Sequence, residues 1–216
     1  MNRMIAAALK FIYPSTAVCM GCGDASGLSR EWLCADCGRF LARSRLGARM
    51  DGELDGMAVA YPYKGPAGGM VRNLKFRGVS QMSGWMADAM IEVYASIQPT
   101  GAEMVASVPM HPRRLKKRGF NHSEILARAV AERIGLPYEN LLIRTRNTPQ
   151  QARLDGEERR KNLENAFEAV RPLEGRRILL VDDVYTTGET ARECARTLRR
   201  AGAANVYFLA FTMGGN

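Results

Sequence analysis

The chain has 216 residues, of which 46% are hydrophobic, and this suits one domain of ordinary size with a small appendage. Its 31 Lys and Arg against 22 Asp and Glu give a formal net charge of +9, which indicates a phosphate-bearing partner, either a small molecule or a nucleic acid. No apolar run is long enough to span a bilayer, so the composition argues against an integral membrane protein. A basic surface without a specific partner is the alternative.

The N-terminal segment is apolar with two basic positions, but its uninterrupted part, residues 5–9, is too short for a secretory signal. We therefore expect a cytoplasmic protein in which this segment forms a short helix docked through one apolar face. Contact with a membrane surface is the alternative, and stable membrane insertion is not expected.

Four cysteines follow with the spacing C-x2-C-x11-C-x2-C: Cys19, Cys22, Cys34 and Cys37. Each C-x2-C pair can present both sulfurs to one tetrahedral Zn²⁺, and four thiolates leave no coordination position for a substrate. The sequence therefore predicts a structural zinc ribbon within residues 1–50 and a second domain over residues 51–216. A disulfide pair is the alternative, although thiols stay reduced in the cytoplasm.

Residues 39–56 are interpreted as the join between these two parts. The pattern then predicts a strand at residues 57–63, a helix within 64–78 that carries a basic cluster (Arg72, Lys75 and Arg77), and an amphipathic helix at 82–97. Trp85 and the methionines of the latter helix are interpreted as core residues. A buried strand is expected at residues 104–109.

A strongly basic segment comes directly after that strand: Arg113, Arg114, Lys116, Lys117 and Arg118, followed by Gly119. Asn121 and Glu124 then have the spacing of a capping arrangement for a helix that runs to Ile134. Loops that follow neighbouring parallel strands converge at one edge of the sheet, so this basic loop could hold a second anion. A solvated face or a nucleic-acid patch is the alternative.

Residues 145–165 are polar and charged, and they predict a flexible loop with a short helix near residues 157–162. Such a loop can close over a charged substrate and exclude water. A surface insertion without an active role is the alternative. Short strands are expected at residues 141–144, 167–170 and 206–211.

An apolar run at residues 178–184 contains Asp182 and Asp183 close to its end. A run of this kind predicts a strand buried on both faces of a parallel sheet, with the acids at its carboxyl end. A turn rich in small and hydroxyl residues then leads into an amphipathic helix, whose apolar stripe includes Cys194 as a core residue.

Free backbone N–H groups at the start of a helix favour an anion, and glycine lets the backbone approach it closely. Two carboxylates beside this turn would repel a bare phosphate, but they suit the ribose hydroxyls and the Mg²⁺ ion of a phosphorylated sugar. We therefore expect a sugar phosphate as ligand. An ordinary strand-to-helix turn with surface acids is the alternative.

The segment VDDVYTTGET resembles the 5-phosphoribosyl-1-pyrophosphate (PRPP) loop of type I phosphoribosyltransferases. The resemblance implies that Asp182 and Asp183, the candidate catalytic acids, meet the ribose hydroxyls and Mg²⁺, while the turn holds the 5′-phosphate. The residues assigned to PRPP in this way are Val184, Thr186, Thr187, Gly188, Glu189 and Thr190.

The chain as a whole resembles the ComF family, through the four cysteines and then, in order, YKGPAGGMVRNLKFRG, VPMHPRRLKKRGFNHSE, TPQQARLDGEERRKNLENAF and VDDVYTTGET. This resemblance implies an α/β protein in which a zinc ribbon joins a type I phosphoribosyltransferase fold. It implies a role in natural transformation, with single-stranded DNA and other competence proteins as partners and a homodimer as assembly. Site residues that it assigns outside the PRPP loop are Arg118 and Gly119 for pyrophosphate, and Gln151, Arg160 and Asn162 in the flexible loop.

Two positions depart from the family pattern. Glu189 adds a carboxylate beside the phosphate turn, which should weaken anion binding unless the side chain points away. His122 stands where the family commonly has glutamine, and we expect it to face solvent rather than to act on a leaving group. Three functions remain open: Mg²⁺-dependent phosphoribosyl transfer to an unidentified nucleophile, a non-catalytic module that senses PRPP or binds single-stranded DNA, and a zinc-dependent scaffold for other competence proteins.

Overall fold

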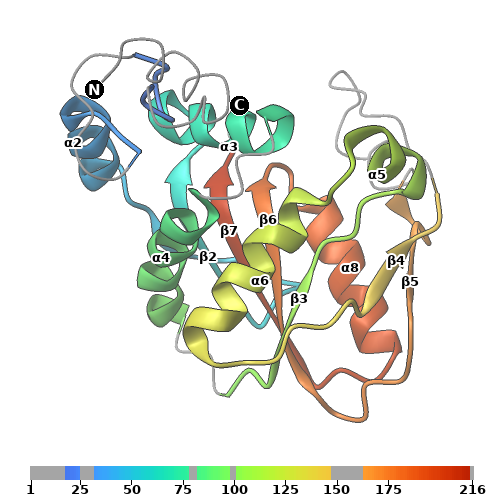
Figure 1. The fold of residues 1–216 in the computed structure, drawn as a ribbon. Helices are drawn as coiled ribbons and strands as arrows, with labels where there is room; N and C mark the ends of the chain where they lie inside the picture. The colour runs from blue at the N-terminus through green and yellow to red at the C-terminus, as the bar shows by residue number, and fades with distance from the viewer. Residues whose placement is uncertain (1–17, 25–31, 78–81, 98–100, 147–162, 215–216) are drawn as a thin grey trace.

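The structure is a computed structural model, and it describes residues 18–24, 32–77, 82–97, 101–146 and 163–214. At its centre is a five-stranded sheet with the strand order β1-β2-β7-β6-β3 (Figure 1). Its four parallel strands are β2 (Gly56–Pro62), β7 (Asn205–Met213), β6 (Arg177–Tyr185) and β3 (Met104–Ser107). Because these strands run in one direction, their carboxyl ends lie at the same edge of the sheet.

The sheet is buried on both faces, as the apolar run in β6 predicted. Successive side chains of a strand point to opposite faces. Accordingly, Leu179 and Val181 belong to one hydrophobic cluster, and Ile178 and Leu180 belong to the other. The strands expected near residues 57–63, 104–109, 178–184 and 206–211 are thus confirmed.

Three helices cover one face of the sheet: α3 (Gly65–Arg77), α4 (Ser83–Tyr94) and α6 (His122–Ile134). The other face is covered by α8 (Glu189–Arg200), beside a small antiparallel ribbon of β4 (Leu142–Arg144) and β5 (Phe167–Ala169) (Figure 1). Core packing is confirmed for Met86, Met90 and Cys194, which are fully buried. Trp85 is half-buried and stacks on Tyr61, with 6.4 Å between ring centroids.

The segment interpreted as a join is itself structured. It contains the end of α2 (Ala35–Arg43) and the strand β1 (Gly47–Arg49), which pairs antiparallel with β2 and forms an edge of the main sheet. A single turn of 3-10 helix, η3 (Ala95–Ile97), follows α4.

Several expected elements lie outside the described residues, namely the N-terminal docking helix, most of the flexible loop and its short helix. Within the described ranges, no helix combines the length and the apolar character needed to cross a bilayer.

The start of α6 follows the sequence prediction closely. Asn121 is the N-cap, and its side-chain oxygen accepts a hydrogen bond from the Ser123 backbone N–H at 3.2 Å. Its Nδ2 donates to the Val108 carbonyl oxygen at 3.0 Å, which ties the helix start to the end of β3. The Glu124 carboxylate pairs with Arg128 one turn later. Asn121 therefore places the first residues of α6 at the carboxyl edge of the sheet.

Candidate functional site

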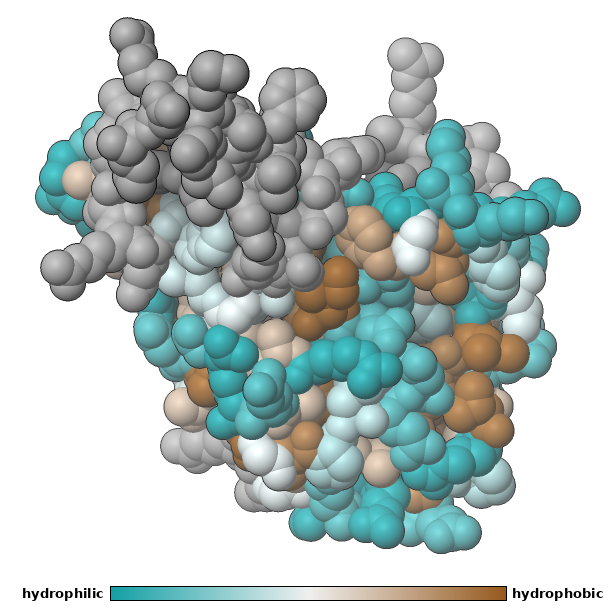
Figure 2. Space-filling view, viewed as in Figure 1, coloured by the Kyte–Doolittle hydropathy of each residue, from teal (hydrophilic) through white to brown (hydrophobic). Residues whose placement is uncertain are grey.

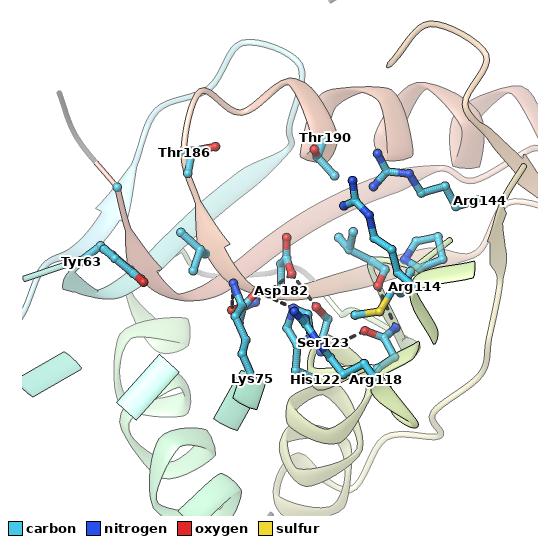
Figure 3. A pocket seen from close by; sticks show the side chains of 17 residues that line it. Tyr63, Lys75, Arg114, Arg118, His122, Ser123, Arg144, Asp182, Thr186 and Thr190 are labelled. Carbon is cyan, nitrogen blue, oxygen red and sulfur yellow. Dashed lines mark hydrogen bonds and ion pairs between the residues drawn. The ribbon is translucent and has the colours of Figure 1, made fainter. Parts of the chain in front are cut away.

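A pocket of about 470 Å³ opens at the carboxyl ends of β3 and β6 (Figure 3). Its walls come from segments far apart in the sequence: the end of β2, α3, the β3-to-α6 segment, β4, and the turn between β6 and α8. This is the place in an open α/β sheet where ligands usually bind. Predicted site residues that line it are Asp182, Asp183, Val184, Thr186, Thr190, Arg114 and Arg118.

The acid pair lies at the floor of the pocket, and each carboxylate has its own partners. Asp182 Oδ1 accepts hydrogen bonds from Ser123 Oγ at 2.6 Å and from the Asp183 backbone N–H at 2.8 Å. Asp183 is buried, and its oxygens lie 2.6 Å from Lys75 Nζ and 3.2 Å from His122 Nε2. The two acids are therefore adjacent in sequence but differ in environment.

This difference separates their pKa values. Burial, together with the charge of Asp183, raises the pKa of Asp182 to about 7. Burial also acts to raise the pKa of Asp183, but the His122 hydrogen bond and the Lys75 charge outweigh it and hold that pKa well below its usual range. Asp183 is thus a permanent anion, while Asp182 can exchange a proton near neutral pH.

The turn between β6 and α8 has the geometry that its sequence predicted. Gly188 is the N-cap of α8 with a φ of +83°, a conformation that glycine adopts without steric cost. Thr186 and Thr190 line the pocket, and Figure 3 shows both side chains above Asp182. Thr187 is exposed and does not line the pocket. Thr186, Thr190 and the first turn of α8 can therefore receive an anion.

Glu189 does not line the pocket. Its Oε1 accepts a hydrogen bond from Arg192 Nη1 at 2.6 Å, so the carboxylate is neutralised by a cation of its own helix. The same guanidinium binds Asp51, with Nε 3.0 Å from Asp51 Oδ2, and Tyr185 donates its hydroxyl to Asp51. The weakening of anion binding expected from Glu189 is thus opposed by Arg192.

The predicted basic loop is a helix, α5 (Pro112–Arg118), and its side chains divide between two faces. Arg114 and Arg118 are four positions apart, hence on one face, and both line the pocket. Arg113 and Lys117 are exposed and lie outside the pocket lining, as does Gly119, which ends the helix in a left-handed conformation. The helical spacing of the two arginines was a signal available in the sequence.

Arg144 of β4 also lines the pocket, although the sequence interpretation did not include it. Figure 3 shows its guanidinium group near that of Arg114, beside Thr190. Burial and the neighbouring charge of Arg114 lower the pKa of Arg144. Two like charges held close together at the mouth of a pocket favour an anionic ligand between them.

The expectation that His122 faces solvent is wrong. The side chain is buried, with Nδ1 3.1 Å from Arg118 Nη1 and Nε2 near Asp183, because the first turn of α6 points its side chains at the end of β6. Lys75 and Ser123 are further pocket residues that sequence reasoning missed as site residues. Their roles depend on contacts across at least 59 positions, for which the sequence carries no local signal. Gln151, Arg160 and Asn162 lie outside the described residues.

The four predicted cysteines form one cluster. The Sγ atoms of Cys19, Cys22, Cys34 and Cys37 all lie within 4.8 Å of one another, and none is in a disulfide. Cys19 and Cys37 are buried within the main hydrophobic core. Burial raises the pKa of Cys19, but hydrogen bonds from the backbone of Cys22 and Cys34 outweigh it and lower that pKa to about 6. Four sulfur atoms this close together fit a tetrahedral metal ion.

Comparisons with known proteins agree with this geometry. A family model described as "Phosphoribosyl transferase domain" matches residues 120–213. The DNA utilization protein YhgH of Salmonella typhimurium is 37% identical over 149 residues, which are 67% of this chain and 66% of that protein. YhgH of Escherichia coli O157:H7 is 32% identical over 198 residues, 88% of this chain and 87% of that protein.

Competence protein ComFC of Bacillus subtilis is 29% identical over 145 residues, which cover 67% of this chain and 58% of that protein. The matched phosphoribosyltransferase domain spans the start of α6, the acid pair and the turn between β6 and α8. The parallel sheet, with its pocket at the carboxyl ends of β3 and β6, is the type I phosphoribosyltransferase fold. The chain therefore belongs to the ComF family of proteins with a phosphoribosyltransferase domain.

Proposed function

We propose that this protein binds PRPP and transfers its phosphoribosyl group to a nucleophile, with release of pyrophosphate, during the handling of imported DNA. The observation that carries the proposal is the convergence of three chemically distinct groups on one pocket of about 470 Å³. These groups are a phosphate turn, an acid pair and a set of arginines, and each comes from a different part of the chain. PRPP has a phosphate, two adjacent ribose hydroxyls and a pyrophosphate to match them.

The pocket suggests an orientation for the ligand. The 5′-phosphate is assigned to the turn that contains Thr186 and Thr190, and the ribose hydroxyls to Asp182 and Asp183. The pyrophosphate is assigned to the cationic wall formed by Arg114, Arg118 and Arg144, because guanidinium groups bind phosphate oxygens with matching geometry. The anomeric carbon then lies between the acids and the arginines.

The reaction breaks the bond between the anomeric carbon and pyrophosphate, which leaves positive charge on the sugar ring. Asp182 and Asp183 hold the ring, and the arginines stabilise the departing anion. Mg²⁺, when bound with the ligand's phosphates, neutralises negative charge on the leaving group. The acid pair fits such an ion through Asp182 Oδ2, to which no described residue donates a hydrogen bond, whereas Asp183 already faces Lys75 and His122.

Zinc is the metal that the cysteine cluster suits best, since thiolate ligands in tetrahedral arrangement select it. We assign it a structural role because four thiolates complete its coordination. Zinc binding by reduced cysteines agrees with a cytoplasmic location, where thiols stay reduced.

Titration calorimetry with PRPP, in the presence and absence of Mg²⁺, tests the binding step. Arg114→Met should weaken binding by at least tenfold, on the order expected for a lost charge-assisted contact. Arg113→Met is the matched control, because Arg113 is adjacent on α5 but exposed and outside the pocket. Equal affinities for the two variants would contradict the assigned pyrophosphate wall.

A pyrophosphate-release assay with nucleobases, ammonia, glutamine and single-stranded DNA then tests the transfer step. Release that depends on one acceptor supports an enzyme and identifies its substrate class. Binding of PRPP without release under any of these conditions would contradict catalysis and favour a PRPP sensor.

The outer face of α5 supports a second candidate function, the binding of single-stranded DNA. Arg113, Lys116 and Lys117 are exposed there, and Figure 2 shows hydrophilic side chains gathered over this helix. Replacing all three with glutamine should weaken binding of an oligonucleotide and flatten its salt dependence between about 50 and 200 mM. An unchanged salt dependence in a fluorescence anisotropy titration would exclude this face as the binding surface.

A further inference from the structure

Helix α3 connects the cysteine cluster to the pocket. Its first half packs against the segment Cys19–Gly23, called here the first knuckle. A Cβ added at Gly69 would lie only 1.9 Å from the Gly21 carbonyl oxygen, and one added at Gly21 would lie 2.8 Å from Pro66 Cβ. The helix and the knuckle therefore touch backbone to backbone, and no larger side chain fits between them.

A hydrogen bond adds to this contact. Asn73 Nδ2 donates to the Met20 carbonyl oxygen at 2.8 Å. Met20 is itself buried, in the same hydrophobic cluster as Met70 and Leu74 of α3. Gly69 and Asn73 therefore hold the knuckle against α3, and Met20 anchors the knuckle in the hydrophobic core. A candidate metal ligand, Cys19, immediately precedes Met20.

The second half of α3 carries Lys75 into the pocket. Lys75 Nζ lies 2.6 Å from Asp183 Oδ2, and its side chain is 20% exposed. Gly69 and Lys75 are six positions apart on one helix, about 9 Å along its axis, so a shift of the helix at the knuckle moves Lys75 as well. Close-packed interiors transmit such shifts rather than absorb them.

We infer that the metal-holding knuckle positions Lys75, and through it Asp183, for the sugar phosphate, with Gly69 and Asn73 as positioning residues. The part of this inference that concerns ligand affinity rests on the proposed function. Without the metal, the knuckle no longer supports α3, the Lys75 to Asp183 ion pair loosens, and the acid that meets the ribose hydroxyls loses its orientation. The zinc ribbon then contributes to the ligand site, although none of its cysteines lines the pocket.

Lysine acylation measured by mass spectrometry tests the coupling without any ligand. In the zinc-loaded protein Lys75 should react slowly, and Lys116 and Lys117, which are exposed, serve as references. Asn73→Ala keeps all four cysteines, and we expect it to retain zinc while Lys75 reacts severalfold faster than in the wild type. Chelation of zinc should have the same effect. Unchanged reactivity of Lys75 in both cases would overturn the inference.

Affinity for ribose 5-phosphate gives the second readout. Gly69→Ala should weaken binding by about tenfold, the range expected when a charge-assisted contact is lost. Gly38→Ala is the matched control in the same ribbon, because a Cβ there meets nothing within 4 Å. In a Lys75→Met background, chelation should no longer change the affinity.

These outcomes separate two failures. If the wild type binds neither ribose 5-phosphate nor PRPP, the proposed function fails, and the acylation rates still decide whether the knuckle positions Lys75. If the wild type binds and Gly69→Ala behaves like Gly38→Ala, the positioning role fails and the proposed function stands.

Discussion

Tyr185, the last residue of β6, donates its hydroxyl to Asp51 Oδ2 at 2.6 Å, although the two residues are 134 positions apart. Arg192 binds the same carboxylate and also the Glu189 carboxylate. These four side chains form a chain of contacts beside the turn between β6 and α8. The turn is therefore supported by the loop between β1 and β2, and the acid at position 189 is directed toward a cation.

Arg192→Gln should weaken binding of ribose 5-phosphate by about tenfold. The substitution removes the cation that neutralises both Glu189 and Asp51, so their negative charges then repel the phosphate. Glu189→Gln in the same background should restore most of the affinity, since the repelling charge is then gone. Glu189→Gln alone should bind at least as tightly as the wild type. A double-mutant cycle by titration calorimetry measures this coupling, and strictly additive losses would show that Arg192 acts without Glu189.

Gly188→Ala should destabilise the protein by about 3 kcal/mol or more, because it adds both backbone strain and a clash. A Cβ there would lie 2.3 Å from the Tyr185 hydroxyl oxygen at a φ of +83°. Gly175→Ala is the control, with a φ of +79° and nothing within 4 Å of its Cβ, so it reports strain alone at about 1–2 kcal/mol. Urea unfolding measures both values, and equal losses would exclude the clash.

Asp182→Asn should stabilise the protein at pH 8 and have less effect at pH 5. Burial and Asp183 raise the pKa of Asp182 from 3.8 to about 7 in the folded state, so its contribution to stability is present below about pH 4 and is lost as the pH rises to about 7. At pH 8 the gain in unfolding free energy from Asp182→Asn is at most about 4 kcal/mol, and it is smaller than this because Asp182 faces the solvent in the pocket. Asparagine keeps the side-chain oxygen that accepts a hydrogen bond from Ser123 Oγ, so this contact is preserved.

Asp51→Asn is the matched control for that pH profile, with the opposite sign. Burial acts to raise the pKa of Asp51, but hydrogen bonds from Tyr185 and Arg192 outweigh it and lower that pKa. The ionised Asp51 therefore stabilises the protein above about pH 4, and this contribution is lost as the pH falls below the ordinary pKa of an aspartate. Thermal unfolding at pH 5 and pH 8 compares the two variants: Asp51→Asn should be less stable than the wild type by the same amount at both pH values, whereas the gain from Asp182→Asn should be larger at pH 8. Destabilisation by Asp182→Asn at pH 8 would contradict the cost assigned to the acid pair.

Cys37→Ser should lower the bound zinc below one ion per chain and lower the melting temperature, because Cys37 belongs to both the cysteine cluster and the core. Cys194→Ser is the control. That cysteine is also fully buried, but it lies in the other core cluster and outside the metal cluster, so it should cost stability without loss of zinc. Zinc analysis of the purified variants distinguishes them, and full zinc content in Cys37→Ser would remove Cys37 from the ligand set.

Local patterns predicted the parts of the site that are contiguous in sequence. The apolar run with two acids and a hydroxyl-rich turn predicted β6, the pocket floor and the start of α8, since hydrophobic period and turn chemistry are local properties. Cysteine spacing predicted the cluster for the same reason. The basic segment is predicted from sequence as a loop, whereas its helical conformation divides it into a pocket face with Arg114 and Arg118 and an outer face.

The sequence by itself determined the family, the α/β class, the cysteine cluster and the two acids, because each depends on motifs that can be recognised along the chain without knowing how it folds. Only the tertiary structure decided what surrounds those acids. Lys75, Ser123 and Arg144 reach the pocket from α3, α6 and β4, and Asp51 binds Tyr185 at the end of β6 from the loop between β1 and β2. Which elements meet at the edge of the sheet depends on the order in which its strands pair, and no local pattern records that order.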